Sequence, residues 1–311
     1  VCTDDVHASD LISRGHVNRA VQRLIASGMD PVQAIRMATL HAAQEYGFKD
    51  LGAIAPGYQA DFQLNDRLDG SQPYAVYVRG QLVAQEGRYL PDDGSDVCRV
   101  QPRNTMHVSQ VQNAQDFYMK APAGRDTVEA LVMERVGQGV LREGTWVTLP
   151  VKDGFVSLEG HPDLAFICVI NRHGADGFSI AVTRDFGLRE GAIASTVSHD
   201  SHNLTIVYRD VESAWQCLTT LAECGGGMCA ARNGRVTQML PLPVAGLMSL
   251  HDCRTLAPEI GRMVEAMQAL CSKPFSLLDI SVYCLPAMPG MVITDRGLVN
   301  STEQRFVEPI R

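Results

Sequence analysis

Apolar residues recur at helical spacing through the first part of the chain. Over 14–26 they lie three or four positions apart, and Gly28 stops the run, which is the pattern of an amphipathic helix. A second such run extends over 30–47, where Asp30 is a good N-cap and Pro31 suits the first helical turn. We therefore expect two consecutive helices.

The spacing of apolar residues then changes to the pattern typical of strands. The stretch 51–64 is strand-like around a Pro56-Gly57 turn, and 74–83 has the pattern of a strand, a glycine-assisted turn and another strand. Together these segments predict a small sheet. The polar residues of 91–96 predict a linker or an exposed loop.

Beyond about residue 120 strand-like and helix-like patterns mix, which predicts a second domain of the α+β class. Asn233-Gly234 between two apolar runs is the favoured two-residue turn of a hairpin. Gly225-Gly226-Gly227 follows a helical run and lacks the Lys and Ser/Thr of a phosphate loop, so it predicts a helix stop and a tight entry into a strand. Strands are expected at 128–132, 166–170, 178–182, 204–208, 228–231 and 236–240, and helices at 211–222 and 258–270.

The opening residues carry the acids that most suggest chemistry. Val1-Cys2-Thr3 has the character of a strand end, and Asp4-Asp5 follow it directly. Barrel enzymes present a metal-binding carboxylate at their catalytic face in this way. Consecutive strand residues face opposite ways, so only one of the two acids can point into such a site. The alternative is that both acids merely cap the following loop or helix.

Composition narrows the class of protein. With 311 residues, 45% of them apolar, the chain is long enough for about two domains with their own cores. A net charge of −8 argues against sequence-independent binding to the phosphate backbone of a nucleic acid. Because we find neither a run of about 18 apolar residues nor a signal-peptide pattern, we expect no membrane and a cytoplasmic location. The nine cysteines are odd in number and include no C-x-x-C pair, which favours reduced thiols.

Several phrases of the sequence resemble known families. Cys2-Thr3-Asp4-Asp5, the helix phrase at 35–39, and 51–57 with Ala60-Asp61 resemble the final part of a metal-dependent amidohydrolase. The later phrases narrow the resemblance to the adenine deaminase family, and it covers essentially the whole chain. They are GAIAS at 191–195, SHDSHN at 198–203, LPLPVAGLMS at 240–249, PF at 274–275 and TDRGLV at 294–299.

The resemblance implies a fold of the α/β plus α+β class. Residues 1–50 would form the last strand and helices of an amidohydrolase (β/α)8 barrel, 51–105 a small β-sandwich portion and linker, and 106–311 the C-terminal α+β domain of adenine deaminases. In that family an early His-x-His pair and later Glu and His residues hold the metals, and no His-x-His occurs in this chain. We therefore expect a C-terminal fragment, or a chain that pairs with a separate N-terminal piece, inactive alone.

The resemblance also implies a reaction, the hydrolysis of adenine to hypoxanthine and ammonia in purine salvage. Replacing the exocyclic amine by oxygen needs a nucleophilic water, which a bound metal supplies by lowering the pKa of water. A neighbouring carboxylate can take the proton and pass it on. The family implies Asp4 as this catalytic residue and as a metal ligand, with Asp5 as its rival. A binuclear manganese site is expected, with iron and zinc as alternatives and the other ligands outside this chain.

Histidines supply the substrate-binding candidates. His7 lies in the loop after the acids, where active-site residues are common, although a lone histidine there also serves as a surface or capping residue. His199, Asp200 and His202 are expected to contact adenine from the second domain. The alternatives are buried polar contacts that tie a strand end to its neighbours, and metal binding. For the complete protein we expect a homo-oligomer with adenine as its substrate.

Two other functions stay open on the sequence. One is an amidohydrolase acting on another cyclic amidine or amide, since one fold hosts many substrates. The other is a non-catalytic binding or assembly domain left after loss of the barrel.

Overall fold

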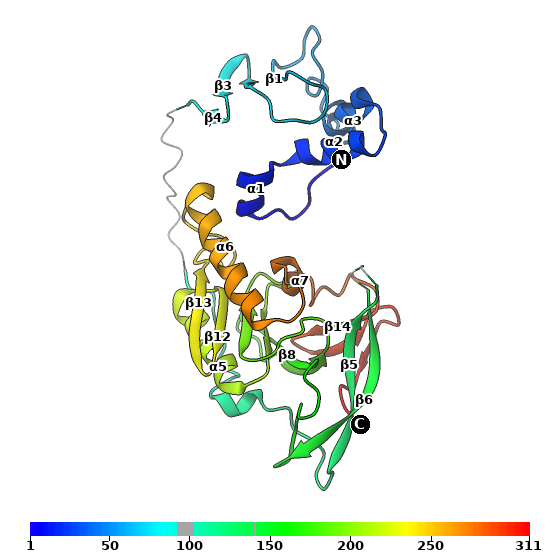
Figure 1. Ribbon diagram of the computed structural model, residues 1–311, viewed down its shortest axis with the longest axis vertical. Coiled ribbons are helices and arrows are strands. Elements are labelled where there is room, and N and C mark those ends of the chain that lie inside the picture. The colour runs from blue at the N-terminus through cyan, green and yellow to red at the C-terminus, as the bar shows by residue number, and fades with distance from the viewer. Residues whose placement is uncertain (92–102, 138, 140) are drawn as a thin grey trace. The chain divides into compact units, whose positions relative to one another are not determined.

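The computed structural model describes residues 1–91, 103–137, 139 and 141–311. The chain divides into an N-terminal unit, 1–99 with 252–258, and a C-terminal unit, 100–251 with 259–311. Each unit is described by itself, and Figure 1 labels many of its elements. Residues 92–96 of the predicted linker lie outside the described residues, and the predicted domain boundaries stay predictions. Within the described ranges, no helix has the length and apolar character needed to span a bilayer.

The N-terminal unit begins with helices. The first predicted helix is confirmed as α2, and Asp30 caps α3 as expected, since its carboxylate accepts a hydrogen bond from the Gln33 backbone N–H at 3.0 Å. The prediction of a single helix over 30–47 is wrong, because the helix is interrupted at Thr39. There the backbone leaves the helical region, with φ −129° and ψ −94°. The helices are α1 (Ala8–Arg14), α2 (Val17–Ala26), α3 (Pro31–Ala38) and α4 (Leu40–Glu45).

The strand expected at the start of the chain is not present in the described structure. A strand forms where its backbone exchanges hydrogen bonds with a neighbour, and none of the described strands pairs with Val1–Thr3. The amino group of Val1 donates instead to the Met37 carbonyl oxygen at 3.0 Å. The origin of residues 1–50 in a barrel therefore stays a prediction.

The small predicted sheet is confirmed, with antiparallel strands in the order β1-β2-β3-β4. Its hairpin turns at Arg79-Gly80, where both residues have positive φ (51° and 76°), as a two-residue turn matched to strand twist requires. The predicted Pro56-Gly57 turn is also present, but only the end of 51–64 forms a strand. The strands are β1 (Phe62–Leu64), β2 (Ala75–Val78), β3 (Gln81–Gln85) and β4 (Arg88–Tyr89).

The C-terminal unit is built on a nine-stranded sheet in the order β13-β12-β10-β11-β8-β9-β5-β6-β7. All neighbours are antiparallel except β5 and β9, which are parallel. The six strands predicted in this part of the sequence are confirmed, including the β12–β13 hairpin with its Asn233-Gly234 turn. The strands are β5 (Thr127–Arg135), β6 (Arg142–Lys152), β7 (Phe155–Val156), β8 (Ala165–Ile170), β9 (Phe178–Thr183), β10 (Ala192–Ser195), β11 (Leu204–Tyr208), β12 (Gly227–Arg232) and β13 (Arg235–Pro241).

Helices and a second sheet complete this unit. Both predicted helices are confirmed, although α6 begins before its predicted start at Pro258. The second sheet has the order β14-β15-β16. The elements are the 3-10 helix η1 (Ala114–Phe117), α5 (Val211–Cys224), α6 (Cys253–Leu270), of which residues 259–270 belong to this unit, α7 (Leu277–Ser281), β14 (Met291–Thr294), β15 (Gly297–Asn300) and β16 (Arg305–Val307).

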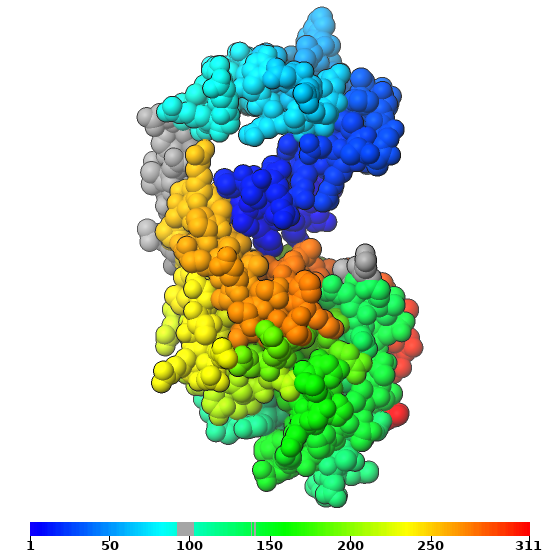
Figure 2. All heavy atoms as spheres, viewed as in Figure 1, coloured from blue at the N-terminus to red at the C-terminus, as the bar shows by residue number. Residues whose placement is uncertain are grey.

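The hydrophobic core of the C-terminal unit lies on the large sheet. One cluster packs α5 and η1 against β8, β10, β11 and β12, and a second joins β5, β6, β8 and β9. Tyr208 on β11 is fully buried in the first cluster, and its hydroxyl donates to the Phe117 carbonyl oxygen at 2.6 Å. Figure 2 shows one outer face of this unit, where the orange residues of α6 and α7 lie next to green ones. This packed sheet is the frame on which the loops at its ends are held.

Candidate functional site

The acids of the opening lie in the N-terminal unit. Asp4 is exposed and has a positive φ of 55°, and its Oδ1 accepts a hydrogen bond from the Asp5 backbone N–H at 2.9 Å. Thr3 Oγ1 lies 2.9 Å from His16 Nε2. His7 is half-buried at the N-cap of α1, where its carbonyl oxygen, not its ring, receives the first hydrogen bonds of the helix.

A hollow of about 610 Å³ lies beside these residues. Thr3, Asp5 and His16 line it together with Arg19 of α2, whereas Asp4 is not among the lining residues. The hollow thus gives the two neighbouring acids different surroundings. Both stay candidates for the catalytic carboxylate.

The described residues do not form a metal site by themselves. Among them no group of three or more His, Cys, Asp or Glu side chains is arranged to hold an ion. Asp4 and Asp5 offer carboxylate oxygens of the kind that divalent cations bind. A single carboxylate from this segment is nevertheless too few ligands for the four to eight that such ions take in proteins.

The second candidate group lies on the loop 196–203 between β10 and β11, here called the histidine loop. The His202 backbone N–H donates to the Ser198 carbonyl oxygen at 2.6 Å and closes the loop on itself, with φ 50° at His202. The rings of His199 and His202 lie edge to face with their centroids 5.5 Å apart. The structure therefore brings the two predicted histidines together, while Asp200 between them is exposed.

A buried arginine anchors this loop to other segments of the unit. Arg172, 1% exposed, follows β8, and its guanidinium donates to the His202 carbonyl oxygen, to Thr105 Oγ1 at 2.7 Å and to the Ala245 carbonyl oxygen at 2.8 Å. Because a buried guanidinium needs such partners to offset the loss of water, these contacts fix three chain segments around one side chain. His173 adds a further link, since its Nε2 lies 2.9 Å from the Ser201 carbonyl oxygen.

The other end of the histidine loop is fixed by a buried threonine. Thr196 Oγ1 donates to the Gly246 carbonyl oxygen at 2.6 Å and accepts from the Gly227 backbone N–H at 2.8 Å. The glycines behave as predicted, because Gly225 ends α5 in the left-handed conformation with φ 84° and β12 begins at Gly227. A side chain at Gly226 would bring its Cβ to 2.6 Å from the Gly246 Cα, so the close approach requires glycine.

The His202 ring has an unusual electrostatic environment. Burial lowers its pKa, and the neighbouring His199 and Arg172 lower it further, while Asp200 acts in the opposite direction. Its Nδ1 is buried and has no hydrogen-bond partner within the described ranges of the chain. A neutral imidazole has one nitrogen that donates and one that accepts. The ring can therefore take an additional polar partner with the tautomer that suits it.

Two residues that anchor the histidine loop were not identified from the sequence. Arg172 and Thr196 each follow a short apolar strand, but nothing local distinguishes them from surface residues at a strand end.

Comparisons with known protein families match both parts of the chain. The profile of the adenine deaminase C-terminal domain matches residues 139–305, more than half of the chain. The profile of the amidohydrolase family matches residues 1–83. The histidine loop lies within the first match, and the opening acids lie within the second.

Curated relatives extend these matches over almost the whole chain. It is 38% identical over 311 aligned residues to an adenine deaminase of Moorella thermoacetica, covering 99% of this chain and 52% of the relative. An adenine deaminase of Ruegeria pomeroyi is 36% identical over 96% of this chain and 51% of its own length. An adenine deaminase of Methanothermobacter thermautotrophicus is 36% identical over 95% of this chain and 54% of its own length. The chain spans about half the length of the curated relatives it matches.

Proposed function

Because the chain belongs to the adenine deaminase family, we propose that it contributes to the hydrolysis of adenine to hypoxanthine and ammonia. The observation that carries this proposal is the match of the adenine deaminase C-terminal domain over 139–305. Water supplies the oxygen that replaces the exocyclic amine, and the amine leaves as ammonia after gaining a proton. The reaction thus needs a group that moves protons between water, ring and leaving amine.

Asp4 is the residue proposed for this proton transfer and for metal binding. Its carboxylate would accept a proton from the attacking water and deliver it to the ring nitrogen or to the leaving amine. The support is its place in the residues that the amidohydrolase profile matches, together with its exposure. Asp5 is the competing assignment, and its place in the lining of the hollow favours testing both.

The metal belongs to the same proposal. The amidohydrolase family implies a divalent ion, and we propose a binuclear manganese site, with iron or zinc as alternatives. Such an ion lowers the pKa of a bound water enough to supply a nucleophile at neutral pH. The described residues contribute one carboxylate, so the other ligands are expected from residues that this chain does not contain.

His199 and His202 are proposed to contact adenine, with Asp200 beside them, and His7 of the N-terminal unit is a separate proposal for substrate contact. Adenine presents ring nitrogens that accept hydrogen bonds and an amine that donates them, which suits a neutral imidazole. The buried, unpartnered Nδ1 of His202 supports this role, since a bound ring could supply the partner that the described residues do not.

The setting proposed for the enzyme is purine salvage in the cytoplasm, with adenine and no nucleic acid or membrane as partner. The net charge of −8 is unsuited to a polyphosphate backbone. A homo-oligomer is proposed for the complete protein. The N-terminal unit exposes large apolar side chains, among them Ile54 (87%), Tyr46 (79%) and Leu68 (60%), which a further polypeptide would cover.

The test is ammonia release from adenine, measured for this chain alone and together with the part of an adenine deaminase that it does not span. Release from adenine but not from cytosine or guanine, with bound metal found by elemental analysis, is the expected result for the completed protein. Release from another ring in preference to adenine would instead support a different amidohydrolase. Absence of release from every ring, with metal bound and the fold intact, would support a binding module.

A further inference from the structure

A second segment of the C-terminal unit holds the histidine loop in place. This segment, residues 276–284, is here called the support segment. Its Ser281 carbonyl oxygen accepts a hydrogen bond from the His199 backbone N–H at 2.7 Å. Its Cys284 Sγ lies 3.1 Å from Thr205 Oγ1, which in turn lies 3.0 Å from Ser198 Oγ in the loop. Two separate links therefore connect the loop to the support segment.

The support segment depends on tertiary contacts for its conformation. Its helix α7 has only five residues, and isolated helices shorter than about 12 residues are marginal in water. Leu277 and Ile280 are buried at 1% and 0% exposure, which fixes one side of the helix. Its first turn is fixed by a capping box, in which Asp279 accepts from the Ser276 backbone N–H at 3.0 Å.

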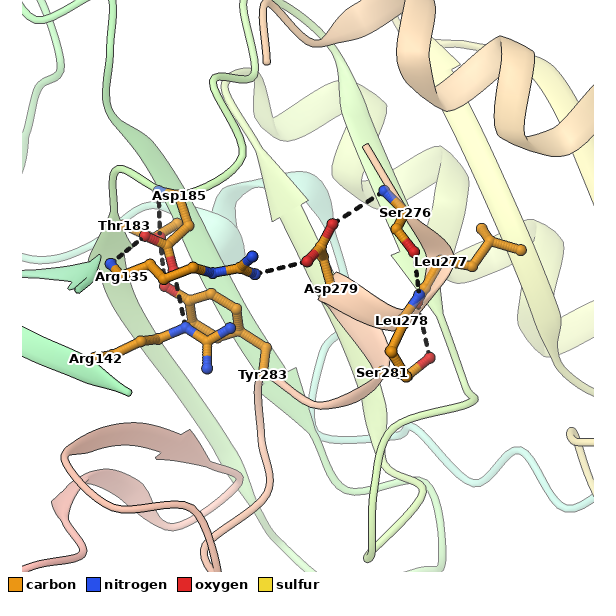
Figure 3. A network of polar contacts seen from close by, with 10 residues as sticks. All are labelled: Arg135, Arg142, Thr183, Asp185, Ser276, Leu277, Leu278, Asp279, Ser281 and Tyr283. Carbon is orange, nitrogen blue, oxygen red and sulfur yellow. Dashed lines mark hydrogen bonds and ion pairs between the residues drawn. The ribbon is translucent and has the colours of Figure 1, made fainter. Parts of the chain in front are cut away.

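Asp279 has a second partner on a different element. Its Oδ1 lies 2.6 Å from Nη2 of Arg135 at the end of β5, and Figure 3 shows the two side chains pointing toward one another. Arg135 is itself fixed, because its backbone N–H donates to Asp185 Oδ1 at 2.6 Å. Asp185 pairs through Oδ2 with the buried Arg142 at 2.8 Å. One carboxylate therefore joins the start of α7 to the buried charges of the sheet.

The pair is electrostatically significant although it is only partly buried. The side chains of Arg135 and Asp279 are 30% and 25% exposed. Burial alone opposes the charged form of Arg135, but its hydrogen bond and attraction to Asp279, together with the attraction of Asp185 and Tyr283, raise the pKa of Arg135. Breaking the pair would leave a partly desolvated charge on each side, which costs more than breaking a pair in water.

We propose that Asp279 is a positioning residue for His199 and His202, acting by fixing α7 to Arg135 so that the Ser281 carbonyl oxygen holds the His199 amide. The consequence for adenine rests on the substrate-binding role proposed above for these histidines. Asp279 would thereby affect substrate binding through the loop and not through contact with the ring. The signature of such a residue is a change in KM with little change in kcat.

The direct test is hydrogen exchange of the His199 amide and the ring NMR signals of both histidines, in the 311-residue chain. Asp279→Ala removes the cap and the ion pair, and it should speed exchange of the His199 amide by about tenfold, the factor expected for loss of one charge-assisted hydrogen bond. Asp279→Asn and Arg135→Gln keep the cap acceptor and remove only the ion pair. They should give a smaller change in the same direction, and Asp279→Glu should restore part of it.

Asp163→Asn is the matched control. It removes another carboxylate–arginine contact of this unit, between Asp163 Oδ2 and Arg184 Nε at 2.7 Å, which involves no residue of the support segment. The His199 amide should then exchange as in the unchanged protein. If Asp279→Asn and Arg135→Gln fold normally and leave the His199 amide and both rings unchanged, Asp279 does not position the loop.

Kinetics with the completed enzyme separate this inference from the proposed function. If both are right, Asp279→Asn raises KM for adenine by about three- to tenfold and changes kcat by less than about twofold. A change in the histidine signals without any change in KM would support the positioning role and overturn the contact of these histidines with adenine. A fall in kcat alone, with His199 exchange unchanged, would overturn the positioning role.

Discussion

Nε of Arg142 lies 2.8 Å from Oδ2 of Asp185, and both side chains are almost completely buried, at 1% and 5% exposure. The Arg142 guanidinium also lies 3.8 Å from the centroid of the Tyr283 ring. Figure 3 shows the two side chains beside one another. Asp185 also accepts a hydrogen bond from the Arg135 backbone N–H. This carboxylate therefore accepts hydrogen bonds from two strands at once, and its removal would take that acceptor from both.

We expect Asp185→Ala to lower the free energy of unfolding by about 3 to 5 kcal/mol, because it removes the carboxylate that pairs with a buried cation. Urea denaturation of the C-terminal unit measures this. Glu134→Gln is the control, since it breaks a pair with Arg184 whose side chains are 41% and 26% exposed; it should cost less than about 1 kcal/mol. Equal costs for the two variants would contradict the importance given to burial.

Gly226→Ala tests the close approach at the end of the histidine loop. Gly226 has φ 106°, and an added Cβ would meet the Gly246 Cα at 2.6 Å. Gly174→Ala shares the positive φ, at 92°, but its Cβ would have nothing within 4 Å. Backbone strain should cost about 1 to 2 kcal/mol in both variants, and the clash about 1 to 3 kcal/mol more at Gly226. Thermal unfolding of the two variants gives the difference.

Thr196→Val removes a hydroxyl that pairs with buried backbone groups of Gly227 and Gly246. We expect a loss of about 1 to 3 kcal/mol, because those groups are left without a partner and the new side chain fills the same space. Thr196→Ser keeps the hydroxyl and should restore most of the stability. If valine and serine behave alike, the packing of the methyl group matters more than the hydrogen bonds.

The pKa of His202 predicts how stability depends on pH. Since burial, His199 and Arg172 lower this pKa in the folded state, the unfolded chain binds the proton more readily. The contribution of His202 to the free energy of unfolding should be fully present above about pH 6.5, the ordinary pKa of histidine. It should be lost as the pH falls from there through the pKa of the folded state. His202→Gln should remove this component from a plot of urea midpoint against pH. A raised ring pKa in an NMR titration would contradict the assignment.

The two opening acids are distinguished by activity. In the completed enzyme, Asp4→Asn should lower kcat for adenine by about 100- to 10,000-fold, the range for loss of a general acid–base group, with little change in stability because Asp4 is exposed. Asp5→Asn should have a much smaller effect. If instead Asp5→Asn abolishes turnover and Asp4→Asn does not, the role belongs to the acid that lines the hollow.

The strands predicted well from the sequence are those built largely from apolar and β-branched residues. In β8 and β11 apolar and β-branched residues fill the strand, because both faces of the sheet are covered. β10 was missed because Ala192–Ser195 consists largely of small residues, whose strand preference comes from their neighbours and not from themselves. The early start of α6 was missed for a related reason, since Pro258 looks like a first-turn residue and lies inside the helix.

The candidate site could be predicted only as a set of residue types. The phrase around His199 and His202 was enough to select them, but the contacts that orient them come from residues far away in the sequence. Arg172 reaches the histidine loop across 30 positions. Asp279 reaches Arg135 across 144. Local patterns carry no information about such pairs, which depend on how strands are ordered in the sheet.

Two of the largest fully buried side chains in the C-terminal unit are cations, Arg142 and Arg172. In a state that kept its secondary structure but lost its side-chain packing, each guanidinium would lose its hydrogen-bond partners. It would still be only partly hydrated, which is costly for a cation. Such molten states should therefore be sparsely populated. The unit is expected to melt as one calorimetric event and to bind little of the dye ANS in mild acid or denaturant.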